Sequence, residues 1–223
     1  MGKEQLRLAL MKLILSAVDE ALASAWHRFC GDLDFVEVHR GSILDVRCDA
    51  IVSPANSFGF MDGGIDALYR SHFGKEIQVR VQQLIGERHH GELVVGAAEL
   101  VETGDDIIPY MVIAPTMRVP MVLTDSVNAY LAARAALLLV KHGRFQSGSE
   151  QGRPIADKIH RLALPGLGTG VGQLGPITCA NQVRAAIDDF LLDGYTPPQS
   201  WAEARERHQL LYTDRPHRLH SGE

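Results

Sequence analysis

The sequence is poor in cysteine and has no surplus of basic charge, and each shortage excludes a class of protein. Its three cysteines, Cys30, Cys48 and Cys179, are odd in number and far apart, which fits neither a disulfide framework nor a four-cysteine zinc site. We therefore expect a reducing, cytoplasmic location and no metal or other cofactor. Lys and Arg total 22 against 27 for Asp and Glu, a net charge of -5. We expect no sequence-specific nucleic-acid partner and no attraction to an anionic membrane.

Long hydrophobic runs are also absent. The longest apolar stretch near the start, 6–18, is interrupted by Arg7 and Lys12 and is too short to span a bilayer. No small-residue cleavage site follows it, so neither a membrane anchor nor an export signal is expected. What is present is a chain of 223 residues with 46% hydrophobic and 22% charged side chains. This composition is typical of a globular domain that buries a sizeable core.

Short apolar stretches alternate with amphipathic ones along most of the chain. The patterns predict strands at 12–17, 35–40, 50–53, 97–102, 110–115 and 159–164, and helices at 20–29, 65–73, 76–88, 126–142 and 176–192. Strands that alternate with helices predict an α/β fold, because each parallel crossover carries the chain back over the sheet. Ligands of such sheets bind outside the carboxyl ends of the strands.

Two glycine-rich segments directly follow predicted strands. The first, SPANSFGFMDGGID, occupies 53–66, and the second, PGLGTGVGQLGP, occupies 165–176. Each precedes a predicted helix, so glycine backbone and helix N–H groups can approach an anion together. Neither contains the Gly-Lys-Ser/Thr of a triphosphate-binding loop, and neither matches the dinucleotide fingerprint. Two interpretations stand: the loops clamp a diphosphate from both sides, or the glycines only make tight turns.

The order and spacing of these segments resemble one known family. GSILDVRCDAIVSPANSFGFMDGGID, at 41–66, resembles the first ligand loop of macrodomains, the ADP-ribose-binding modules also described as Appr-1-p processing domains. GAAELVETG at 96–104 and IPYMVIAPT at 108–116 resemble the middle strands, and LPGLGTGVG at 164–172 resembles the second phosphate loop. The occurrence of NSFGFMDGGID, APTMRVP and GLGTGVG together is most similar to a bacterial and phage-related branch.

The resemblance implies a three-layer α/β/α fold with a mixed, mostly parallel central sheet. It assigns 34–194 to the macrodomain core and 1–33 to an added N-terminal edge strand and helix packed on that core. The remaining residues, 195–223, are expected to form a C-terminal helix, at 200–211, and a disordered tail.

The resemblance also assigns roles in the two loops. Asn56 would bind the distal ribose, and Asp66, ten positions further on, would lie near that ribose and a water. These two are the candidate catalytic residues. The candidate diphosphate contacts are Gly63, Gly64 and Ile65 in the first loop and Gly168, Thr169, Gly170, Val171 and Gly172 in the second. For Asp66, the alternative is a carboxylate that only stabilises a helix N-terminus.

One departure from the family pattern concerns the nucleobase. Most macrodomains have Gly-Asp-Ile where this chain has Gly41-Ser42-Ile43, and that Asp accepts a hydrogen bond from the adenine amino group. Ser42 is a weaker, uncharged acceptor that could still bind the base, and Ile43 could pack on the ring. Phe58, Phe60 or Tyr195 would either cover the ligand or only pack.

Three functional hypotheses follow from the resemblance. The first is an ADP-ribosyl hydrolase, which would remove ADP-ribose from a protein carboxylate or acetate from O-acetyl-ADP-ribose. The second is a non-catalytic module that binds ADP-ribose or a related nucleotide. The third is a structural or phage-associated protein that keeps the fold but has lost the ligand. For the first two, the expected partner is ADP-ribose or an ADP-ribosylated protein.

Overall fold

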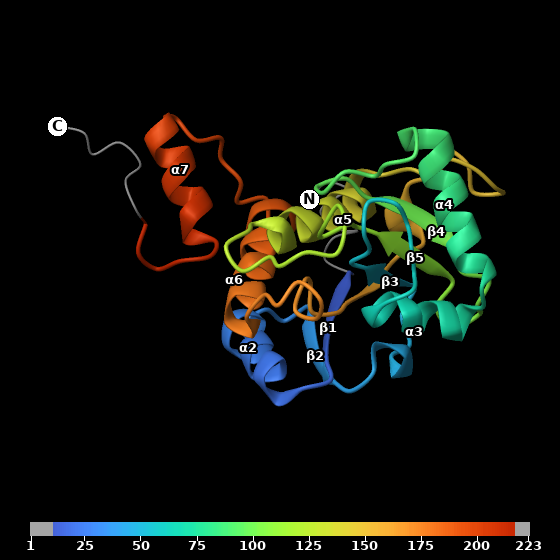
Figure 1. Ribbon diagram of the computed structural model, residues 1–223, viewed down its shortest axis with the longest axis horizontal. Helices are drawn as coiled ribbons and strands as arrows, with labels where there is room; N and C mark the ends of the chain where they lie inside the picture. Colours follow the sequence, from blue (N-terminus) through green and yellow to red (C-terminus); the bar gives the residue numbers. More distant parts are fainter. Residues whose placement is uncertain (1–10, 217–223) are drawn as a thin grey trace.

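Six strands form one sheet in the computed structural model, which describes residues 11–216 (Figure 1). Along the sheet the order is β2-β1-β6-β3-β5-β4. The strands are β1 (Lys12–Ala17), β2 (Val36–Arg40), β3 (Ala50–Ser53), β4 (Glu99–Glu102), β5 (Tyr110–Ile113) and β6 (Arg161–Leu164). All neighbours pair in parallel except β4, which is antiparallel to β5. The predicted mixed, mostly parallel sheet is confirmed.

Helices cover both faces of this sheet (Figure 1). They are α2 (Glu20–Cys30), α3 (Gly64–Phe73), α4 (Glu76–His89), α5 (Asn128–His142), α6 (Pro176–Ala186) and α7 (Trp201–Leu210), with short turns η1 (Ile43–Asp45), η2 (Ile155–Asp157) and a π-helical η3 (Ile187–Leu191). No helix of residues 11–216 is long and apolar enough to cross a bilayer.

Two separate hydrophobic cores define the three layers. In β1, Leu13 and Leu15 pack with α2, α5 and α6, whereas Ile14 packs with α3 and α4 on the opposite face. Successive strand residues point to opposite faces, so a central strand must be apolar at every position. The expected α/β/α layering is confirmed.

The predicted place of the N-terminal strand was wrong. We expected 1–33 to add an edge strand, but β1 lies between β2 and β6, and β2 forms the edge. The physical reason is visible in the two sequences. KLILSA is buried on both faces from Leu13 onward, whereas VEVHR is nowhere fully buried, which suits a strand with one neighbour.

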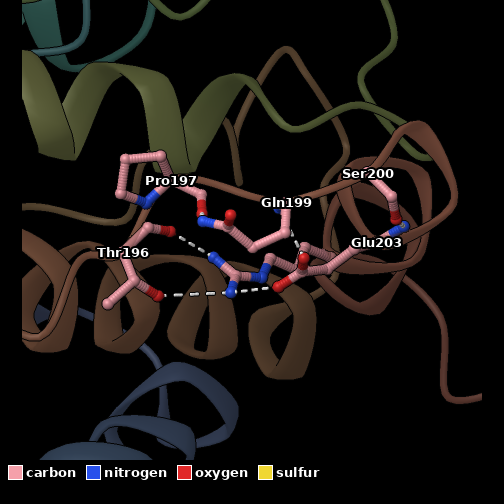
Figure 2. Close-up of polar contacts among 6 residues, drawn as sticks. Thr196, Pro197, Gln199, Ser200 and Glu203 are labelled. Carbon is pink, nitrogen blue, oxygen red and sulfur yellow. Dashed lines mark hydrogen bonds and ion pairs between the residues drawn. The ribbon is translucent and has the colours of Figure 1, made fainter.

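The C-terminal helix α7 stands apart from the body of the molecule (Figure 1). It is tied to its own connecting segment by Arg207, whose guanidinium donates to the Thr196 carbonyl at 2.5 Å and pairs with Glu203. The Gln199 N–H also donates to Glu203, at 2.6 Å (Figure 2). On the body, Asn181 donates to the Leu210 carbonyl at 3.1 Å. The helix predicted at 200–211 is thus present, while 217–223 of the predicted tail lie outside the described residues.

Candidate functional site

A cleft of about 680 Å³ lies at the carboxyl edge of the parallel strands. Its walls are the segments that follow β2, β1, β6, β3 and β5, which is also their order across the sheet. The cleft contains every residue predicted from the two loops and the Gly-Ser-Ile segment: Ser42, Ile43, Asn56, Gly63, Gly64, Ile65, Asp66, Gly168, Thr169, Gly170, Val171 and Gly172. The tertiary structure therefore brings together segments more than 100 positions apart in the sequence.

Asp66 is the buried carboxylate of the cleft. It sits in the first turn of α3 with 7% of its surface exposed, and its Oδ1 accepts a hydrogen bond from the Ser53 hydroxyl at 2.5 Å. Burial raises the pKa of Asp66 to about 6, against the opposing effect of the Ser53 hydrogen bond. Asp62, by contrast, is exposed and pairs with Arg70 at 2.6 Å. Asp66 is therefore able to exchange a proton near neutral pH.

The side chain of Asn56 organises its own loop. Its Oδ1 accepts from the backbone N–H groups of Phe58 at 3.1 Å and Phe60 at 3.3 Å, and its Nδ2 donates to the Phe60 carbonyl at 2.7 Å. An amide nitrogen carries two hydrogens, so one N–H is left for a ligand. The segment is also paired with the loop after β5 through a bridge between Asn56 and Met117. Asn56 thus fixes the wall of the cleft in addition to the predicted ribose contact.

Some of the loop glycines are required by the fold. Gly168 has a φ of +74°, a conformation that favours glycine. A Cβ at Gly166 would lie 2.4 Å from the Thr169 hydroxyl, and one at Gly172 would lie 2.5 Å from the Gly168 carbonyl oxygen. For these positions, turn formation and packing are a sufficient explanation.

Gly63 and Gly170 are different, because neither the backbone nor packing requires a glycine there. Both lie outside the left-handed region, and a Cβ at either would meet no heavy atom within 4 Å. Both line the cleft, so a side chain would enter it. Gly63 is also the N-cap of α3 and supplies no side-chain cap, which leaves the first N–H groups of the helix without that partner. This combination leaves space and backbone donors for an anion.

Positive charge contributes little to the cleft. Among residues 11–216, Arg118 lines the cleft, and no other lysine or arginine does. Its guanidinium makes two hydrogen bonds to Glu92, at 2.6 and 3.1 Å, and lies 5.1 Å from the centre of the Phe58 ring. An anion in the cleft would therefore depend on backbone N–H groups rather than on a free cation.

The predicted aromatic cover is only partly present. Phe58 and Phe60 line the cleft, and Phe60 is half-exposed. Tyr195 is not among the lining residues; it stacks on Phe190, with ring centres 5.2 Å apart. Ile43 lines the cleft but is 2% exposed and belongs to the core, so it has little surface for stacking on a base.

Sequence reasoning missed two parts of the wall. The first is Val18 and Asp19, which follow β1, and the second is 116–120, which follows β5. The strand ends were the available signal, because any residue just after a parallel strand belongs to the ligand edge. The cysteines are excluded as nucleophiles: all three are buried, and burial raises the pKa of each thiol to about 12.

The fold and the cleft together define an α/β protein with glycine-rich loops that line a cleft at the carboxyl edge of the sheet. The family model of the Macro domain matches residues 52–183. This is more than half of the chain, which therefore belongs to the Macro domain family.

Several proteins are similar to this chain in sequence or in fold. An uncharacterized protein of Aquifex aeolicus is 32% identical over 155 residues, covering 70% of this chain and 82% of that protein. Among solved structures, the macrodomain of Mycobacterium tuberculosis DarG matches with a TM-score of 0.53 and 19% identity, over 68% of this chain and 88% of the other. A variant of the Oceanobacillus iheyensis macrodomain with ADPR matches with a TM-score of 0.54 and 19% identity, over 77% and 86%. At these identities the structural matches establish the fold.

Proposed function

We propose that this protein binds an ADP-ribosyl group in the cleft and hydrolyses an ester bond at the distal ribose. The observation that carries the proposal is the buried carboxylate of Asp66 in a cleft lined by both glycine loops. Family membership supports the ligand, since the Oceanobacillus iheyensis macrodomain variant of the same fold was solved with ADPR.

The strand order suggests how the ligand lies. The loops after β6 and β3, which contain Gly170 and Gly63, occupy the middle of the cleft. We place the diphosphate there, where backbone N–H groups and the α3 N-terminus face an open space. The distal ribose then lies beside Asp66 and Asn56, and the base lies toward β1 and β2.

The reaction requires one proton acceptor. A water oxygen forms a bond to the anomeric carbon while the bond from that carbon to the ester oxygen breaks, and the acceptor chain leaves as a carboxylate. The proton lost by the water passes to the carboxylate of Asp66. The products are ADP-ribose and a free carboxyl group. Binding of the diphosphate positions the ester next to the acid–base residue.

A non-catalytic module is the second candidate. One specific observation favours it: three of the hydrogen bonds available to the Asn56 side chain are used within its own loop. A site that holds the ribose through a single remaining N–H could bind the ligand without aligning the ester for attack.

One experiment distinguishes the two candidate functions. The purified protein is titrated with ADP-ribose by calorimetry and incubated with a protein that carries labelled ADP-ribose on a glutamate. For a hydrolase, the wild type binds and releases label, Asp66→Asn binds without release, and Gly170→Glu does neither. Asp45→Asn, an exposed carboxylate outside the cleft, serves as the matched control and retains both. Binding without release by the wild type would instead establish the second candidate, and no binding would reject both.

A further inference from the structure

The carboxylate of Asp62 lies beside the backbone donors that we assign to the diphosphate. Asp62 lines the cleft and directly precedes Gly63, the N-cap of α3. Its side chain is 64% exposed. An ionised aspartate has the same sign of charge as a diphosphate and repels it. The first glycine loop therefore contains a charge that opposes the proposed ligand.

Arg70 offsets this charge from the last turn of the same helix. It follows Asp62 by eight positions, and its Nη1 donates to the Asp62 Oδ1 at 2.6 Å. Arg70 itself does not line the cleft, whereas Asp62 does. The guanidinium is thus placed behind the carboxylate and acts on a ligand only through it.

Stability alone does not account for the placement of the Arg70 guanidinium. Its Nε is buried and has no hydrogen-bond partner among residues 11–216. A buried N–H without an acceptor is destabilising, and an ion pair with an exposed carboxylate contributes little in return. Asp66, one turn earlier on α3, accepts its hydrogen bond from Ser53 instead. The charge of Arg70 is therefore directed to Asp62.

We propose that Arg70 is a positioning residue that neutralises Asp62 and so keeps the first glycine loop able to accept a diphosphate. Without this pair, the carboxylate next to Gly63 repels the diphosphate and competes with it for the positive end of α3. The inference rests on the proposed binding of an ADP-ribosyl group and adds the control of charge in the loop that binds it.

Direct attraction between Arg70 and the ligand would depend on Asp62 in a different way. If the arginine attracted the diphosphate itself, its removal would weaken binding whether or not Asp62 is charged. If it neutralises Asp62, removal of both charges leaves the net charge of the loop unchanged. The two single variants and the double variant together therefore separate the two roles.

The test measures ADP-ribose affinity by calorimetry at low and high salt. In Arg70→Gln the affinity falls about fivefold relative to the wild type at about 0.05 M NaCl. Most of this loss disappears at about 0.5 M NaCl, because salt screens the exposed Asp62 carboxylate. Asp62→Asn binds at least as tightly as the wild type, and the double variant Asp62→Asn/Arg70→Gln regains wild-type affinity. Arg70→Lys, which retains the positive charge, also retains the affinity.

Arg153→Gln is the matched control. Arg153 pairs with Glu150 at 2.5 Å, and neither residue lines the cleft, so this variant keeps wild-type affinity at both salt concentrations. A double variant as weak as Arg70→Gln would overturn the inference while leaving ADP-ribose binding intact, and so would a loss in Arg70→Gln that persists at high salt. Failure of the wild type to bind ADP-ribose would overturn the proposed function together with the inference.

Discussion

The hydroxyl of Ser53 and the carboxylate of Asp66 form a buried hydrogen bond of 2.5 Å across the base of the first glycine loop. Ser53 is the last residue of β3, and Asp66 lies in the first turn of α3. The bond therefore closes the loop that forms one wall of the cleft. It also fixes the ionisable group whose protonation the proposed reaction requires.

The first prediction concerns the pH dependence of ester hydrolysis. Because the pKa of Asp66 is raised to about 6, the fraction of the ionised base grows as the pH rises through this value. We expect the rate of label release to increase from pH 5 to pH 7 and then to level off, in initial-rate measurements. A rate that is constant over this range would remove Asp66 as the proton acceptor.

The second prediction follows from the Ser53 hydrogen bond. Ser53→Ala removes a donor that stabilises the ionised form of Asp66, so the pKa of Asp66 rises further. We expect the rate profile to shift to higher pH, with a larger loss of activity at pH 6 than at pH 8. Ser53→Thr, which retains the hydroxyl, should preserve the wild-type profile. An equal loss at both pH values would indicate a structural role only.

The third prediction links Asp66 to stability. Its pKa is raised on folding, from 3.8 to about 6, so the folded state favours the protonated form. The free energy of unfolding should therefore fall as the pH rises from about 4 to about 6, by on the order of 3 kcal/mol in total. Asp66→Asn carries no charge and should be more stable than the wild type at pH 7.5 but not at pH 4. Urea unfolding at both pH values measures this difference, and Asp45→Asn, at an exposed position, should show none.

The fourth prediction separates the two kinds of glycine in the second loop. Gly170→Val places a side chain in open space in the cleft, so we expect an unchanged unfolding midpoint and loss of ADP-ribose binding. Gly166→Val drives its Cβ against Thr169 and Leu22 and should cost about 1–3 kcal/mol of stability. Thermal unfolding and calorimetry on the same preparations distinguish the two. Wild-type affinity in Gly170→Val would show that the ligand does not pass this glycine.

The fifth prediction concerns the attachment of α7. Arg207→Ala removes the hydrogen bond to the Thr196 carbonyl and the pair with Glu203. We expect faster proteolytic cleavage in 192–200, while the unfolding midpoint of the body changes little, since exposed ion pairs contribute at most about 1 kcal/mol. A large fall in the midpoint would show that α7 belongs to the cooperative core.

The sequence was most informative where a local rule determines the structure. Alternating strand and helix patterns gave β1, β3 and α2 at or within one residue of their observed ends. The helix predicted at 176–192 was less accurate: it ends as an α-helix at Ala186 and continues as a π-helical turn. In that region Lys141, from α5, is buried and donates to the Phe190 carbonyl at 2.9 Å. A contact between such distant segments cannot be predicted from the spacing of hydrophobic residues in the sequence.

The sequence by itself determined which segments form strands and helices and where the two glycine-rich loops lie. The spacing of hydrophobic residues and the placement of glycines are properties of neighbouring residues, so both can be read locally. The tertiary structure alone decided which strand forms the edge, since pairing of β1 with both β2 and β6 joins residues far apart in the chain. It also decided the state of Asp66 and the place of Asp19. Burial by surrounding segments raises the pKa of the former, and the pairing of β1 with β2 puts the latter in the same cleft as Ser42. Burial and adjacency arise only when the chain is folded, so neither can be read from local spacing.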